Sequence, residues 1–254
     1  MYSPLVNLVA SLLVTGLTLA AELAGVALAI ELISSVAHLL WIPLVGLAVW
    51  LVIWRTRFET MERVFGLAGL ALVFFVVAVF RLDPAWGSVL EAVTHPEVPG
   101  GEGLPTYFYY AIALFASAMT PYEVFFFSSG GIEEKWKPKD LTTARVNVFL
   151  GFPLGGLLAL SIMTAAALLL HPAGIAVDHL SQAVLPVGYA LGKIGLGLVL
   201  IGVFAAAFGA ALETALSSGC TVAQHFGWTW GKTAAPPGRP PASTPWRSWP
   251  WWRA

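Results

Sequence analysis

The feature that most constrains this chain is a series of long apolar stretches separated by short polar segments. The stretches cover roughly residues 5–33, 37–54, 64–82, 106–130, 146–170 and 186–217. A helix that crosses a bilayer needs about 20 mostly apolar residues, whereas the strands of a membrane barrel alternate apolar and polar residues. The run L-V-F-F-V-V-A-V-F at 72–80 does not alternate. The stretches therefore predict six transmembrane helices.

The composition of the chain agrees with a membrane environment. Hydrophobic residues make up 58% of it and charged residues 11%, and the mean hydropathy is +0.80. A water-soluble fold of this composition would expose large apolar patches. The lipid bilayer is therefore the predicted partner, and we expect neither a nucleic-acid partner nor an enzymatic activity.

Basic residues indicate how the spans are oriented, since Lys and Arg collect in cytoplasmic loops. They gather between the second and third spans, between the fourth and fifth, and after the sixth: Arg55, Arg57, Arg63, Lys135, Lys137, Lys139, Arg145, Lys232, Arg239, Arg247 and Arg253. Arg81 and Lys193 lie on the other side. We expect a multi-pass protein of the cell membrane with both termini in the cytoplasm.

Four acidic residues fall inside the predicted spans, where an ionisable group costs about 2.5 kcal/mol or more unless it faces protein or water. Glu31 and Glu213 lie close enough to span ends to be solvated. Glu22, in the run A-A-E-L-A-G, is surrounded by small residues that allow close helix packing. Two interpretations of Glu22 stay open: a carboxylate hydrogen-bonded to a neighbouring helix, or a residue that lines an ion or proton path.

The sequence A-S-A-M-T-P-Y-E at 116–123 predicts a break in the fourth span. Pro121 has no N–H and its ring clashes with the carbonyl four residues earlier, so a continuous helix there is disfavoured by about 3 kcal/mol. Thr120 as N-cap, Pro121 as the first helical residue and Glu123 as the partner in a capping box are typical of a new helix start. We therefore expect Ala116 to Met119 to be unwound.

Unwound backbone at membrane depth is tolerated only against protein or a water-filled cavity. Broken helices of this kind mark substrate sites near the midplane of secondary transporters. An ordinary proline kink, in which Glu123 only caps a helix, is the alternative.

The stretch A-S-A-M-T-P-Y-E-V-F-F-F-S-S-G resembles the broken sixth helix of the NRAMP family of divalent-metal transporters. The run A-A-E-L-A-G-V-A-L-A-I-E-L resembles the third helix of that family, and E-T-A-L-S-S-G-C-T-V-A-Q-H-F-G-W the end of its eighth. The resemblance covers about residues 5–232. It implies an all-α membrane protein that contains helices three to eight of a LeuT-like inverted-repeat fold.

The resemblance also implies a metal site between two broken helices. Ser117 takes the place of an alanine whose backbone carbonyl faces the ion, and Thr120 that of a methionine ligand. A thioether favours softer ions such as Mn²⁺, whereas a hydroxyl suits Mg²⁺, which keeps several of its waters. The chain is thus similar to the magnesium-transporting branch, with Mg²⁺ or Mn²⁺ as transported ion, no resident cofactor, and Glu123 against the water shell of the ion.

Two departures from the family pattern concern proton coupling. Tyr122 stands where the family has a histidine, and Gly25 stands where the resemblance places a second acid after Glu22. Tyrosine and glycine do not exchange protons readily at physiological pH. Glu22 and Tyr122 remain the candidate residues of an ion or proton path, but proton-coupled uptake is not expected.

No stretch resembles the first helix of the family, with its D-P-G-N run, or helices nine and beyond. Residues 233–254 are rich in Pro, Arg and Trp and predict a segment that is disordered, adsorbed at the membrane or translated out of frame, although a natural proline-rich tail would look similar. We expect an incomplete copy of a divalent-metal transporter. The alternatives are an amino-acid transporter of the same broken-helix fold, against which Glu123 argues, and an inert membrane fragment of a damaged gene.

Overall fold

The computed structural model describes residues 4–56, 58–95, 103–117, 119–133, 135–175, 177, 180–228 and 230. Within these ranges every regular element is helical, which confirms the predicted all-α class. The elements are α1 (Pro4–Ser34), α2 (His38–Arg55), α3 (Phe58–Gly69), η1 (Leu70–Leu72), α4 (Val73–Arg81), α5 (Trp86–Thr94), α6 (Leu104–Ser117), α7 (Pro121–Glu133), η2 (Pro138–Asp140), α8 (Leu141–Val146), η3 (Asn147–Gly151), α9 (Phe152–Leu169) and α10 (Leu180–Phe226). The predicted tail, 233–254, lies outside the described residues.

Six helical stretches in the described chain are long and apolar enough to cross a membrane, as the sequence predicts. They are Pro4–Ser34, His38–Arg55, Arg63–Arg81, Leu104–Ile132, Pro138–Leu169 and Ser181–Phe226. The third of these combines α3, the 3₁₀ turn η1 and α4, and the fourth combines α6 and α7. The protein is therefore a multi-pass membrane protein.

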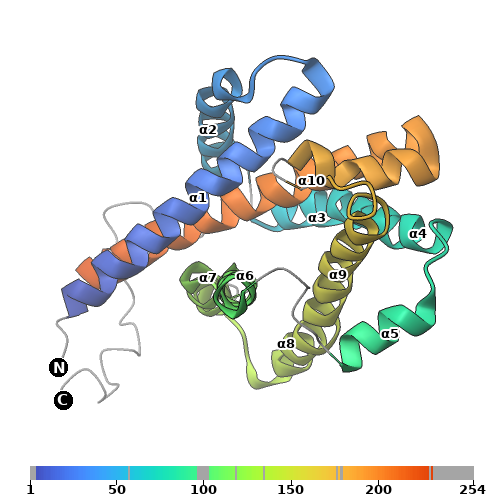
Figure 1. Ribbon diagram of the computed structural model, residues 1–254. Helices are drawn as coiled ribbons and strands as arrows, with labels where there is room; N and C mark the ends of the chain where they lie inside the picture. The colour runs from blue at the N-terminus through green and yellow to red at the C-terminus, as the bar shows by residue number, and fades with distance from the viewer. Residues whose placement is uncertain are drawn as a thin grey trace.

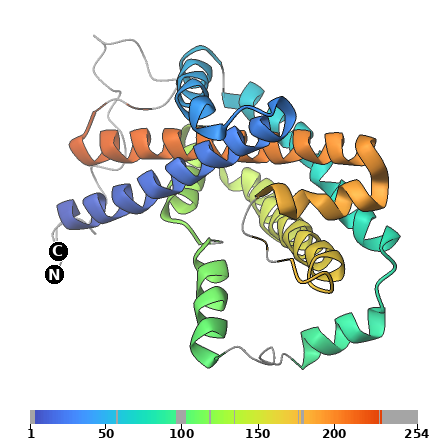
Figure 2. The ribbon, with the colours of Figure 1, turned by 45° about the horizontal axis from the view of Figure 1, so that its top comes forward.

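The last helix, α10, consists of two limbs that meet at Gly192. There the backbone adopts φ 68° and ψ −165°, a conformation that is open to glycine but not to residues with a Cβ. The chain doubles back at this point, so that the short limb before Gly192 lies beside the start of the long limb (Figures 1 and 2). The span predicted over 186–217 therefore contains this bend, and its residues 186–191 lie on the short limb.

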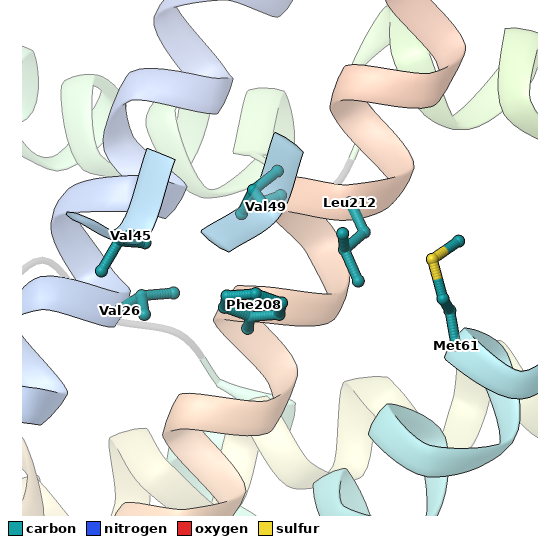
Figure 3. Close-up of a cluster of buried hydrophobic side chains, with 7 residues drawn as sticks. Val26, Val45, Val49, Met61, Phe208 and Leu212 are labelled. Carbon is teal, nitrogen blue, oxygen red and sulfur yellow. The ribbon is translucent and has the colours of Figure 1, made fainter. Parts of the chain in front are cut away.

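Two buried apolar clusters join the other helices to α10. The first gathers residues of α1, α2 and α3 around the long limb, as Figure 3 shows: Val26, Val45, Val49, Met61, Phe208, Ala211 and Leu212. The second joins α4 to both limbs of α10: Phe75, Ala78, Val184, Val187, Val199 and Leu200. The long limb is thus the element against which most of the bundle packs.

Two helices take little part in this packing. Helices α5 and α6 make no extensive contact with any other element of the described chain, and both lie apart from the bundle in Figure 2. The described side chains of α6 are all exposed except Tyr107, which is half-buried. Lipid is the environment that suits such an apolar surface.

The close approach of α10 to η1 at Gly202 gives a stability prediction. A Cβ added at Gly202 would lie 2.8 Å from the backbone nitrogen of Leu72 and 3.1 Å from the carbonyl carbon of Ala71. Since neither backbone atom can swing aside, we expect Gly202→Ala to lower the free energy of unfolding by about 1–3 kcal/mol. Titration of the purified protein in mixed micelles with SDS, followed by circular dichroism, measures this.

Gly197→Ala is the matched control, because no described atom lies within 4 Å of a Cβ at Gly197 on the same limb. It should leave stability unchanged or raise it by up to about 1 kcal/mol, since alanine is the better helix former. Equal losses in the two variants would contradict the close approach of α10 to η1.

Candidate functional site

The helix break predicted at Pro121 is present, but it is shorter than expected. Helix α6 ends at Ser117 and α7 begins at Pro121, so Ala116 lies in the last turn of α6 and is not unwound. The reason is local: the missing N–H and the ring of Pro121 act on the carbonyl four residues earlier, which is that of Ser117. The described non-helical residues of the break are Met119 and Thr120.

Helix α7 is fixed to α10 by two hydrogen bonds. The hydroxyl of Ser217 donates to the backbone carbonyl of Tyr122 at 3.0 Å, and Nε2 of Gln224 donates to Oγ of Ser129 at 3.1 Å. Both Tyr122 and Ser129 are buried. The half of the broken helix that follows Pro121 is therefore part of the packed bundle, whereas α6 is not.

Glu22 of α1 faces the same region. One of its carboxylate oxygens, Oε1, accepts a hydrogen bond of 2.9 Å from the hydroxyl of Thr214 on α10. The side chain of Tyr122 lies beside this carboxylate. Of the two interpretations of Glu22, the hydrogen bond to a neighbouring helix is therefore present. It does not use the whole carboxylate, since Oε2 is buried and has no partner at hydrogen-bond distance within the described residues.

A second buried oxygen, the side-chain hydroxyl of Thr120, lies at the start of α7. The backbone N–H of Glu123 donates to the carbonyl of Thr120 at 3.2 Å, as at a helix start. The hydroxyl oxygen of Thr120 is buried and has no described partner at hydrogen-bond distance, so it does not cap the N–H of Glu123; the Glu123 carboxylate is the polar side chain that interacts with it. The Glu123 carboxylate lies near Thr120 and close enough to Glu22 for the two charges to repel each other.

The structure thus brings together some of the predicted site residues and not others. Glu22, Tyr122 and Glu123, with Thr120 beside Glu123, form an oxygen-rich region where α1, α7 and α10 meet. The side chain of Met119 is 65% exposed. Ser117 is exposed too, and its hydroxyl donates to the carbonyl of Leu114 at 2.8 Å, within its own helix.

The described residues contain no group of three or more His, Cys, Asp or Glu side chains that could hold a metal ion. Any ion in this region would depend on hydroxyl, carbonyl and water oxygens as well as on carboxylates. Such oxygen ligands are those that hard divalent cations accept.

The comparison with protein families agrees with this arrangement. The family model named Nramp, described as natural resistance-associated macrophage protein-like, matches residues 4–237, which is most of the chain. The chain belongs to the Nramp family. Membership supports the transport of divalent metal ions in general terms and confirms the family resemblance of the sequence. A search of curated proteins gave no match.

Sequence reasoning missed the polar stripe by which α10 of this Nramp chain contacts α1 and α7. The stripe consists of Thr214, Ser217, Thr221 and Gln224, whose spacing of three, four and three residues places them on one helix face. Three of its members bond to α1 or α7. The signal was in the sequence, since small polar side chains at helical spacing inside an apolar span indicate interhelical hydrogen bonds.

Gly25 has a packing role in this Nramp chain. A Cβ at Gly25 would lie 3.7 Å from Cβ of Ala207, so α1 and α10 meet closely at this point, three residues after Glu22. The small residues around Glu22 therefore allow the close packing of α1 on α10 that the sequence predicts. This packing brings the Glu22 carboxylate within hydrogen-bond distance of Thr214.

Of the two other acids of the spans, Glu31 lies outside this region, whereas Glu213 is close enough to Tyr122 for an electrostatic interaction. Glu31 closes the turn between α1 and α2: its Oε2 accepts the backbone N–H of His38 at 3.0 Å and lies 2.7 Å from Nδ1 of the same residue. Glu213 lines a cavity of about 330 Å³ between α3, α7 and α10, with Met61, Phe65 and Phe126 among the other lining residues.

The bond between Thr214 and Glu22 gives a second prediction. Thr214→Val keeps the shape of the side chain but removes the donor to Oε1 of Glu22. Because a buried carboxylate would then lose a hydrogen bond, we expect the free energy of unfolding to fall by about 1–3 kcal/mol. The same SDS titration measures this loss.

Thr18→Val is the control on α1, because the Thr18 hydroxyl donates to the carbonyl of Val14 within its own helix. We expect little change in that variant. If Thr214→Val were as stable as Thr18→Val, the contact between α1 and α10 would not depend on this hydrogen bond.

Proposed function

We propose that this chain forms one side of the ion path of a divalent-cation transporter that prefers Mg²⁺ to softer metals such as Mn²⁺ or Cd²⁺. The observation that carries the proposal is the helix break at Pro121, at whose end the buried hydroxyl of Thr120 lies beside the carboxylate of Glu123. Family membership gives the class of substrate. The chemistry of the donor oxygen gives the preference within that class.

Thr120 supplies a hard oxygen ligand in the place where the resemblance puts a thioether. The carbonyl of Ser117, which lacks its usual helical N–H donor because residue 121 is proline, is a second oxygen at the break, at the end of α6. Mg²⁺ retains several waters when it binds, and the carboxylate of Glu123 is near enough to Thr120 to accept hydrogen bonds from them. The thioether of Met119, in contrast, is largely exposed.

Glu22 and Tyr122 line the proposed path on the side of α1. The Glu22 carboxylate, with the side chain of Tyr122 beside it, offers further acceptor oxygens near Glu123, and the resemblance to the family puts the buried Tyr122 in the place of a histidine. A tyrosine there does not pass protons readily at physiological pH, so the proposed transport moves metal without a matching flow of protons.

The proposal includes a LeuT-like inverted repeat, both termini on the cytoplasmic side, and a second ligand-bearing broken helix that the residues described here do not supply. Neither the amino-acid transporter nor the inert fragment is favoured by any contact in the structure. An amino-acid carboxylate would meet the negative charge of Glu123 at the start of α7, which argues against the former.

Replacement of the hydroxyl by a thioether tests the ligand assignment. We expect Thr120→Met to raise the ratio of Cd²⁺ affinity to Mg²⁺ affinity by about tenfold or more, equivalent to about 1.4 kcal/mol, because a softer ligand enters the site. Competition of Mg²⁺ and Cd²⁺ with bound Mn²⁺, followed by the EPR signal of free Mn²⁺, measures the ratio on purified protein.

Ser117→Ala is the matched control, since it removes a hydroxyl that bonds within α6 and keeps the backbone carbonyl. The affinity ratio should stay at the parent value. An unchanged ratio in Thr120→Met, or an equal change in Ser117→Ala, would show that Thr120 is not a ligand.

Transport by these residues alone provides a further check. A hard divalent ion takes about six oxygen ligands, and the carbonyl of Ser117 and the hydroxyl of Thr120 provide two of them. We therefore expect no Mg²⁺ influx above background in liposomes that contain the 254-residue chain and an enclosed Mg²⁺ indicator. Mg²⁺ influx that is abolished by Thr120→Met would contradict the need for a second broken helix. Acidification of the liposome interior during that influx, reported by an enclosed pH-sensitive dye, would contradict the uncoupled mechanism.

A further inference from the structure

Helix α5 (Trp86–Thr94) has two chemically different faces and little contact with the bundle. Trp86, Val89 and Leu90 follow the spacing i, i+3, i+4 and share one face, while Ser88 and Glu91 lie on the opposite one. Leu90 is 65% exposed and Trp86 48%. Val89 is half-buried, but since α5 makes no extensive contact with another described element, most of this apolar face is not covered by the described chain.

An aromatic contact fixes the depth of α5 relative to the membrane. Helix α4 ends the third apolar span at Arg81, and Phe80, one residue earlier, exposes 64% of its surface on the outside of that span. The ring of Trp86 lies 5.2 Å from the ring of Phe80, centroid to centroid. The first residue of α5 is therefore level with the last aromatic ring of the lipid-facing surface of α4.

The connection between the two helices turns the chain at this level. Asp83 has a φ of 49°, in the left-handed region, and is followed by the buried Pro84. Neither residue can continue α4, because a left-handed residue and a proline both interrupt the helical hydrogen bonds. Helix α5 then starts at once, with the backbone N–H of Ser88 donating to the carbonyl of Ala85 at 2.9 Å.

We propose that α5 is an interfacial helix that lies in the headgroup region of the bilayer at the end of α4. Trp86, Val89 and Leu90 face the acyl chains, and Ser88 and Glu91 face water. Lipid is the occupant because the apolar face continues the lipid-exposed surface of α4 through the contact of Trp86 with Phe80. Tryptophan is enriched at this interface, and amphipathic helices lie within it.

Site-directed spin labelling in liposomes tests the orientation of α5. Leu90→Cys and Ser88→Cys, each in a Cys220→Ser background, place a nitroxide on opposite faces; the collision rates with oxygen, which concentrates in lipid, and with aqueous Ni(II)EDDA are then compared. We expect the ratio of oxygen to nickel collisions to be at least several-fold higher for Leu90→Cys than for Ser88→Cys. Val89→Cys and Glu91→Cys form a second pair with the same expectation if a variant of the first pair does not fold.

Two other outcomes would overturn the proposal. Equal and high accessibility to nickel at both positions would place α5 in water. Low accessibility to both reagents at Leu90→Cys would mean that protein, and not lipid, covers the apolar face. Circular dichroism and size-exclusion profiles that match the parent protein establish that each labelled variant is folded.

Discussion

The close packing of α1 on the long limb of α10 is the contact on which the rest of this structure depends. It is made by small residues, such as Gly25 against Ala207, and by Val26, whose side chain is fully buried. In a membrane the lipid offers apolar groups as favourable as those of a neighbouring helix, so close contact rather than escape from water holds helices together. Helices α2, α3, α4 and α7 then attach to the surface that this pair provides.

Polar side chains inside this bundle are satisfied mainly by α10. Its stripe of Thr, Ser and Gln side chains forms hydrogen bonds with α1 and α7. Each hydrogen bond satisfies a polar group whose burial in hydrocarbon without a partner would be costly. Against this background two unpartnered oxygens in the described region, Oε2 of Glu22 and Oγ1 of Thr120, stand out because both lie near Glu123. Buried acceptors without donors are the arrangement that a passing cation and its waters can use.

Much of this architecture could be predicted from the sequence. Hydropathy gave the six spans, and the chemistry of Pro121 gave the break, since a missing N–H acts locally whatever surrounds it. The turn at Gly192 could not be found in the same way, because both limbs of α10 are equally apolar and Gly192 is one of several glycines in 188–197. The hydrogen-bond partner of Glu22 could not be predicted either, since Glu22 and Thr214 are 192 residues apart in the sequence and meet only because α1 packs on α10. The roles of Ser117, Thr120 and Glu123 toward a metal remain predictions.

The isolation of α6 has a consequence for the way the fourth span crosses the membrane. Its 14 residues form a rod of about 21 Å at 1.5 Å per residue, which is shorter than a hydrocarbon core of about 30 Å. The rest of the fourth span is provided by α7, so α6 carries the chain only part of the way across the hydrocarbon core. Since no other described element contacts α6 extensively, the part of the span before the break faces lipid, whereas the part after it is packed against α10.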